Sequence, residues 1–293
     1  MMTESKMDMN GKTALITGAN TGLGFEIARA LATRGAQVIV AGRNEAKVQT
    51  AIDRIKDEAP DARLEVGLVD LNALASVKDF ATRIANTHTR LDILINNAGV
   101  MVPPAGTTQD GFETQFGVNF VAHFALTGHL IQLLNAAPAA RVVTLSSIGH
   151  RGAVLDFDNF QLEKPYDPWR EYGQSKLADL VFALELDRRL RAKDSSVRSL
   201  AAHPGVSQTD LTRNLGDIPA GIKMMPPADG AAPALVAATD THVEGGQYWG
   251  PDGPEERSGT PGLAIVDAAA LKDGVAERLW DWAEKATGIK YPQ

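Results

Sequence analysis

Short apolar segments alternate with longer amphipathic segments along most of the chain. The apolar segments are rich in Val, Ile and Leu over their whole length, which is typical of strands buried on both faces of a parallel sheet. The segments between them have apolar residues at helical spacing. This alternation predicts a doubly wound α/β fold, with about seven strands in one parallel sheet and helices on both of its faces.

The boundaries of these segments follow from their composition and from the Gly and Pro residues between them. We find no linker or repeat, so we predict a tail at 1–10 and a single domain at 11–293. The predicted strands are 13–17, 37–41, 63–68, 91–95, 141–145, 197–202 and 246–249. The predicted helices are one that begins near 22, and 44–58, 74–87, 109–134, 172–192, 229–239 and 267–287.

Composition narrows the possible functions. The 293 residues are 44% hydrophobic and 22% charged, with 29 basic and 36 acidic side chains and a net charge of −7. An acidic chain lacks the positive field that nucleic acid binding requires, so we expect no nucleic acid partner. The chain has no cysteine, which excludes disulfides and thiolate sites, and its histidines lack metal-ligand spacing, so we expect no metal. No apolar run approaches the roughly 20 residues of a membrane span, and we expect a cytoplasmic location.

A glycine-rich segment, TGANTGLG, lies between the first predicted strand and the first helix. A turn of this kind lets backbone N–H groups and a helix N-terminus approach a pyrophosphate, so it predicts a dinucleotide site. The alternative is a tight turn without a ligand. The candidate contacts are Gly18, Asn20, Thr21, Gly22, Leu23 and Gly24.

The ends of the second and third predicted strands bear on the choice of nucleotide. No acidic residue stands at the end of the second strand; Arg43 and Asn44 stand there instead. A guanidinium group can pair with a 2′-phosphate, which predicts that NADPH is preferred over NADH. The alternative is a solvated surface arginine. Asp70 and Leu71, after the third strand, are further candidate cofactor contacts; Asp70 either accepts a hydrogen bond from adenine or caps the helix that begins near residue 74.

Tyr172 and Lys176 are separated by four residues at the start of a long predicted helix. Residues at this spacing share one helix face, and an ammonium group beside a phenol stabilises the phenolate form that acid–base chemistry requires. By itself the pair also fits an ordinary helix surface.

Further candidates lie where other strands end, which is the edge that binds ligands in open α/β sheets. Ser147 follows the fifth strand, where a serine hydroxyl can either hold a substrate oxygen or cap a turn. Asn119 lies inside a helix, although asparagine is a weak helix former. The remaining candidates are Asn97, Ala98 and Gly99 after the fourth strand, and Pro204, Gly205, Val206 and Thr209 after the sixth.

Together these motifs resemble the short-chain dehydrogenase/reductase family, over about residues 11–250. The matching segments are TGANTGLG, NNAG, Asn119, the strand end at Ser147, YGQSK and PGVSQT. The resemblance implies a Rossmann-like fold and an enzyme. Ser147 and Tyr172 are 25 residues apart, farther than in many members, which resembles the subset with retinol dehydrogenases and protochlorophyllide reductases. The added stretch, about 149–170, lies either over the substrate pocket or as a self-packed surface loop.

The resemblance also implies residue roles. Asn119, Ser147, Tyr172 and Lys176 correspond to a catalytic tetrad, in which Tyr172 is the general acid/base and Ser147 polarises the substrate carbonyl. Lys176 binds the nicotinamide ribose, and Asn119 positions a water molecule. Thr209 bonds the carboxamide, and the segment at Pro204 and Gly205 passes beneath the nicotinamide ring.

We therefore predict an oxidoreductase that transfers a hydride between NADP(H) and an alcohol or carbonyl substrate. The apolar residues of 207–227 predict a lid and an apolar substrate; a hydrophobic cluster under a long loop is the alternative. The alternative function is a non-catalytic NADP-binding sensor or scaffold, and a lyase or epimerase is disfavoured by the glycine spacing. Members of the family often pair through their two long helices, so we expect a homodimer or homotetramer.

Overall fold

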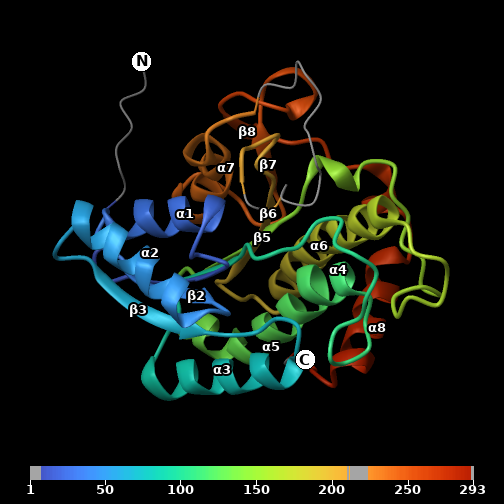
Figure 1. The fold of residues 1–293 in the computed structure, drawn as a ribbon, viewed down its shortest axis with the longest axis horizontal. Coiled ribbons are helices and arrows are strands. Elements are labelled where there is room, and N and C mark those ends of the chain that lie inside the picture. The colour runs from blue at the N-terminus through green and yellow to red at the C-terminus, as the bar shows by residue number, and fades with distance from the viewer. Residues whose placement is uncertain (1–7, 210, 212–223, 292–293) are drawn as a thin grey trace.

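A computed structural model describes residues 8–209, 211 and 224–291. One eight-stranded sheet forms the centre, in the order β3-β2-β1-β4-β5-β6-β7-β8 (Figure 1). The first seven strands are parallel, which confirms the predicted fold class. The strands are β1 Thr13–Thr17, β2 Gln37–Gly42, β3 Arg63–Leu68, β4 Ile93–Asn96, β5 Arg141–Leu145, β6 Arg198–Ala202, β7 Tyr248–Pro251 and β8 Pro261–Leu263.

Helices cover both faces of the sheet. Apolar residues of α1, α2 and α7 pack against one face, and those of α3, α5 and α6 pack against the other. Consecutive residues of β1 therefore point into different cores: Leu15 faces α3 and α5, and Ile16 faces α1. The helices are α1 Gly22–Ala32, α2 Glu45–Glu58, α3 Leu74–Thr87, α4 Thr114–Phe116, α5 Ala122–Asn135, α6 Pro168–Arg191, α7 Pro227–Thr239 and α8 Val275–Thr287.

The strand count of about seven was one short. The additional strand, β8, has three residues and pairs antiparallel with β7 at the edge of the sheet. It was missed because three residues are too few for a pattern of apolar positions to stand out. The domain also begins slightly before Gly11, since Met9 is buried and its N–H donates to the carbonyl of Arg34.

Three helix boundaries differ from the prediction. The helix expected from 109 begins at Thr114, because Thr107 and Glu113 pair across a turn before it, and it contains a π-helical turn at Gly117–Val121. The final helix is split into a short turn at Ala268–Leu271 and α8. The long helix begins at Pro168 and not at Tyr172. Asp167 caps it by accepting hydrogen bonds from two backbone N–H groups, and Asp followed by Pro is a recognisable start signal.

The insertion, about 149–170, packs largely against the rest of the domain. The Phe160 ring stacks on Phe116, with ring centroids 3.9 Å apart, and its edge meets Trp282 of α8. The Tyr166 hydroxyl donates to the carbonyl of Pro103 at 2.6 Å. Two large apolar side chains of this stretch are exposed, Val154 at 72% and Trp169 at 58%.

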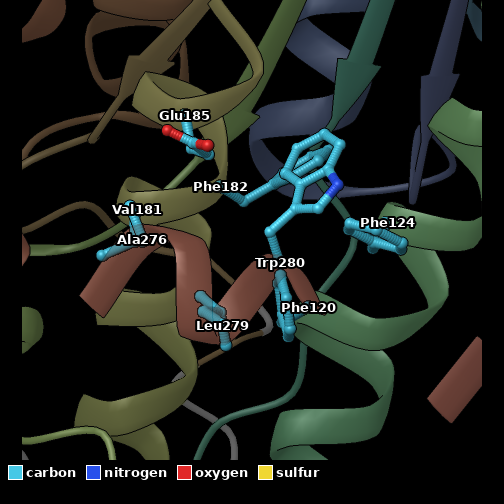
Figure 2. Close-up of a pocket in the computed structure, with 8 residues that line it drawn as sticks. All are labelled: Phe120, Phe124, Val181, Phe182, Glu185, Ala276, Leu279 and Trp280. Atoms are coloured by element: carbon cyan, nitrogen blue, oxygen red, sulfur yellow. The ribbon is translucent and has the colours of Figure 1, made fainter. Parts of the chain in front are cut away.

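Helix α8 lies across α5 and α6 (Figure 1). Trp280 packs edge-on against Phe124 and stacks with Phe182 at a narrow apolar crevice that is also lined by Val181 and Leu279 (Figure 2). Thr114–Asn135 is long and apolar enough to span a membrane by composition, but 78% of its 18-residue window is buried inside the protein. We expected homo-oligomer contacts on the outer surfaces of α5 and α6. Helix α8 covers part of these surfaces. The oligomeric state stays a prediction.

Candidate active site

The glycine-rich segment forms a tight turn between β1 and α1. Gly18 and Gly22 have φ angles of +65° and +56°, in the left-handed region that favours glycine. A Cβ atom at Gly24 would lie 2.4 Å from the carbonyl oxygen of Gly18, so only glycine fits where the helix crosses the strand. These constraints explain the spacing of the three glycines.

The segment after β6 closes over this turn. A Cβ atom at Gly22 would lie 3.3 Å from Cβ of Thr209, which places Thr209 directly above the loop. Ser207 forms a parallel bridge with Met225, so the chain leaves and returns at the same point. The predicted lid at 207–227 falls mostly outside the described residues, since 210 and 212–223 are not among them.

Arg43 and Asp70 meet at the far end of the turn. The Arg43 guanidinium lies 4.0 Å from the Asp70 carboxylate, and 76% of the arginine side chain is exposed. Asp70 does not cap α3: its carboxylate accepts from the N–H of Asn72, and Asp110 accepts from the N–H of Leu74 instead. Asn44, predicted as a cofactor contact, caps α2 by accepting from the N–H of Lys47.

The turn after β4 is held against the glycine loop by Thr17. Its Oγ1 atom accepts hydrogen bonds from the backbone N–H groups of Asn97 and Ala98, both at 3.0 Å. The side chain of Asn97 donates in return to the carbonyl of Thr17 at 2.7 Å. These bonds bring the predicted contacts at residues 97–99 beside Gly18.

Asn119 lies in the π-helical turn and joins the β4 turn to α6. Its Oδ1 atom accepts from the N–H of Val100 at 2.8 Å, and its Nδ2 atom donates to the carbonyl of Val100 and to the Ser175 hydroxyl. Both hydrogens of the amide are thus bonded to protein atoms. A π-helical turn inside an α-helix is frequent at functional sites, and here it marks the residue that the sequence singled out.

His123 was set aside in the sequence but belongs to this network. Its Nδ1 atom lies 2.7 Å from the carbonyl of Asn119 and its Nε2 atom 2.9 Å from the Thr17 hydroxyl. A carbonyl only accepts, so Nδ1 carries the hydrogen and Nε2 accepts from Thr17. Burial lowers the pKa of His123 to about 4, and the ring stays neutral at physiological pH.

The two serines after β5 have different surroundings. Ser146 is buried and its hydroxyl donates to the carbonyl of Lys176, which makes it part of the packing between β5 and α6. Ser147 is only half-buried, and its Oγ accepts from the N–H of Gly149. A Cβ atom at Gly149 would lie 3.0 Å from the Tyr172 ring and 3.4 Å from Ser147 Oγ, so Ser147 and Tyr172 both lie close to this one position.

Tyr172 and Lys176 lie on the inner face of α6 and both are buried. The Lys176 ammonium donates to the carbonyl of Leu145 at 2.9 Å and to the carboxylate of Asp179 at 2.8 Å. A Cβ atom at Gly99 would lie 3.8 Å from Nζ and 3.2 Å from the Oδ1 atom of Asn119. Asn119 and Lys176 therefore meet at Gly99 of the β4 turn, while Ser147 and Tyr172 meet at Gly149.

Asp179 was not predicted as part of the site. It is 1% exposed, and burial raises the pKa of its carboxyl to about 7, although the nearby ammonium of Lys176 opposes the rise. In the sequence it is simply an acid three residues after a lysine, a spacing common among surface ion pairs. Only its burial distinguishes it.

The comparisons with known proteins agree with this geometry. A family model for short chain dehydrogenases matches residues 12–219. The chain belongs to the short-chain dehydrogenase/reductase family. Its oxidoreductase fold and the retinol dehydrogenase-like subset were both predicted correctly.

Among short-chain dehydrogenases of known name, the chain is similar to retinol dehydrogenase 13 of Mus musculus, with 38% identity over 97% of this chain and 86% of that protein. It is also similar to polyprenol dehydrogenase of Homo sapiens, with 36% identity over 80% of this chain and 74% of that protein.

Solved structures of the family share the fold. A protein from Mycobacterium paratuberculosis superposes with a TM-score of 0.82 and 38% identity, covering 98% of this chain and 97% of that one. A short chain dehydrogenase from Escherichia coli, complexed with NADPH, superposes with a TM-score of 0.67 and 26% identity, covering 83% of this chain and 98% of that one.

The described part of this short-chain dehydrogenase contains no group of three His, Asp or Glu side chains that could hold a metal ion.

The segment after β6 takes its shape from buried polar contacts. His203 is fully buried and bonds to Glu256, while Gly205, with φ of +61°, has no room for a side chain beside the carbonyl of Arg257.

Proposed function

We propose that this enzyme uses NADPH to reduce an apolar carbonyl compound, or NADP⁺ to oxidise the corresponding alcohol. The observation that carries the proposal is the meeting of Lys176 and Asn119 at Gly99, in the turn beside the glycine loop, while Tyr172, one helical turn before Lys176, meets Ser147 at Gly149. The E. coli relative that is complexed with NADPH supports the choice of cofactor.

The glycine turn fits a dinucleotide. Gly18 and Gly22 hold the backbone in left-handed conformations, and the N-terminus of α1 adds partial positive charge for a pyrophosphate. Arg43 would pair with the 2′-phosphate, and Asp70 would bond the adenine amino group. The residues at 97–99, Lys176 and the segment from Pro204 to Thr209 would hold the nicotinamide half. When bound, the cofactor supplies or accepts the hydride.

The chain's own residues supply orientation and the proton. Tyr172 would donate a proton to the carbonyl oxygen in reduction and accept it in oxidation. Ser147, which lies near the same Cβ position of Gly149 as the Tyr172 ring, would hold the same oxygen through its hydroxyl group. Lys176 would orient the ribose and favour the phenolate, and Asn119 would keep the β4 turn in register with α6.

The surroundings of Tyr172 favour an apolar substrate. The Trp169 ring lies edge-on to the Tyr172 ring, with centroids 6.5 Å apart, and 58% of Trp169 is exposed. An exposed tryptophan beside an acid–base group offers an apolar contact to the part of a substrate that extends away from the reacting carbon. Two relatives are named for retinol and polyprenol, both long apolar alcohols.

The test is the loss of NADPH absorbance with a panel of carbonyl compounds that includes retinal and short and long aldehydes. Tyr172→Phe removes the proton donor but keeps the ring, so turnover should fall by about 10²–10⁴ while NADPH still binds. Tyr166→Phe is the matched control, because this tyrosine lies in the insertion and bonds to Pro103. Binding of NADPH without turnover of any compound would favour the sensor or scaffold instead.

A further inference from the structure

Asp179 is a buried carboxylate that the proposed chemistry does not use. Its side chain is 1% exposed, and its Oδ2 atom accepts from the Lys176 ammonium at 2.8 Å. Within the described part of the chain, its Oδ1 atom has no hydrogen-bond partner. Burying a half-satisfied carboxylate is costly, so its place beside Lys176 calls for an explanation.

The pair fixes the direction of the lysine side chain. An ammonium group has three hydrogens, and two of them are bonded to Asp179 and to the carbonyl of Leu145. The nitrogen lies 3.8 Å from the position of a Cβ at Gly99, in the turn expected to contact the cofactor. The two acceptors therefore hold the ammonium at the cofactor side of α6 and leave one hydrogen for a ligand.

The pair also changes the charge near Tyr172. Tyr172, Lys176 and Asp179 follow at intervals of four and three residues, so they occupy one face of α6 over two turns. When Asp179 is ionised, the positive charge of the Lys176 ammonium and the negative charge of the carboxylate largely cancel each other at more distant groups. With Asp179 protonated, a full positive charge remains next to the tyrosine.

Among the described residues, Lys176 is the charged group that acts on Asp179. The titratable neighbour from α5 is His123, which stays neutral because burial lowers its pKa to about 4. The strands packed against this face, β4, β5 and β6, carry titratable side chains only at Arg141 and Arg198, which begin β5 and β6 at the opposite edge of the sheet.

We infer that Asp179 is a positioning and charge-balancing residue for Lys176: its protonation sets the net charge that α6 presents to Tyr172 and to the cofactor. The inference rests on the proposed function of Tyr172 and Lys176. The raised pKa of Asp179, about 7, places the change in charge near neutral pH.

The first test compares pH profiles of NADPH-driven reduction, measured with the carbonyl compound that the wild-type enzyme reduces fastest. Asp179→Asn keeps the shape of the side chain but leaves Lys176 uncompensated, so the phenol should lose its proton more easily. The alkaline fall in rate should then move to lower pH. Removing one charge about 10 Å away, at an effective dielectric constant of about 20, corresponds to about one pH unit.

Asp187→Asn is the matched control. Asp187 is also a buried aspartate of α6, but it pairs with Arg191 and lies two turns farther from Tyr172. Its variant should follow the wild-type profile. A profile of Asp179→Asn that coincides with the wild type, or moves to higher pH, would overturn the inference.

A second test needs neither substrate nor a substituted protein. In the wild-type enzyme labelled with ¹³C, the Asp179 carboxyl carbon is assigned through its own backbone resonances and titrated with and without NADP⁺. We expect a midpoint near 7 that moves when NADP⁺ binds. A midpoint below about 5, or one that NADP⁺ leaves unchanged, contradicts the inference. If no carbonyl compound is reduced, the proposed function fails, and this titration still decides the role of Asp179.

Discussion

Two pairs of a basic side chain and an aspartate flank the candidate site, and they differ mainly in burial. Arg43 and Asp70 lie 4.0 Å apart with 76% and 32% of their side chains exposed. Lys176 and Asp179 lie 2.8 Å apart with 5% and 1% exposed. The exposed pair costs little to open, because water replaces the partner of each group. The buried pair has no such replacement, so its two charges depend on each other.

This difference suits the two ends of a dinucleotide. At the exposed end, Arg43 would exchange Asp70 for the 2′-phosphate of the proposed cofactor, which would give a selectivity that responds to salt. At the buried end, the inferred charge beside Tyr172 would be set by the protein and would respond to protons. The three predictions below alter one end at a time, in order of decreasing effect.

Breaking the buried pair should have the largest effect. Lys176→Met leaves Asp179 buried without its partner, and the free energy of unfolding at pH 8 should fall by about 3–5 kcal/mol. The pKa of Asp179 is already raised to about 7, so the carboxyl binds a proton in acid, and the loss at pH 5 should be smaller. Urea unfolding at the two pH values measures both.

Lys164→Met is the control for that experiment, because Lys164 pairs with Asp156 at an exposed position. Its cost should stay below about 1 kcal/mol. Equal losses for Lys164→Met and Lys176→Met would mean that burial does not distinguish the pairs.

The neutral histidine beside the buried pair should give an acid-sensitive stability. The pKa of His123 is about 4 in the folded protein against about 6.5 when unfolded, so the unfolded state binds the proton first as the pH falls. The contribution of the neutral His123 ring to the free energy of unfolding is complete above about pH 6.5. It falls by about 2–3 kcal/mol as the pH decreases towards 4. His123→Asn should flatten this part of the stability curve, and the exposed His242→Asn should not. An unchanged slope for His123→Asn would show that the buried ring does not titrate as described.

Altering the exposed end should change selectivity more than stability. Arg43→Ala should weaken NADPH binding by about ten- to a hundredfold and leave NADH binding nearly unchanged, since only NADPH carries the 2′-phosphate. The preference of the wild type should shrink as salt rises. Lys47→Ala, which removes an exposed basic side chain from α2 just after Arg43, is the control. Wild-type protein that binds NADH as tightly as NADPH at low salt would refute the role of Arg43.

The sequence predicted the parts of the site that depend on local geometry. Gly18, Gly22 and Gly24 are all required by one tight turn. Tyr172 and Lys176 share a helix face because residues four positions apart always do so in an α-helix. The ends of the parallel strands were also predicted to within a few residues, because the apolar pattern of a buried strand is a local property of the sequence.

The parts that depend on distant contacts were missed. His123 acquires its role from Thr17, 106 residues earlier in the chain, and nothing in its neighbourhood signals that contact. Asp179 is distinguished by burial, which depends on how α6 packs against β5. The alternative that Asp70 caps α3 was wrong because Asp110, from the loop before α4, takes that position.

The place of α8 has a consequence for the order in which the protein is made. Its Trp280 covers Phe124 and Phe182, which are translated well before it. Until α8 has left the ribosome, these rings lack their final cover, and the growing chain presents an aromatic surface of the kind that chaperones bind and that promotes aggregation. The glycine turn and the first six strands, which end at Ala202, are translated well before α8, but Phe124 and Phe182 gain the cover of Trp280 only when this C-terminal helix is complete.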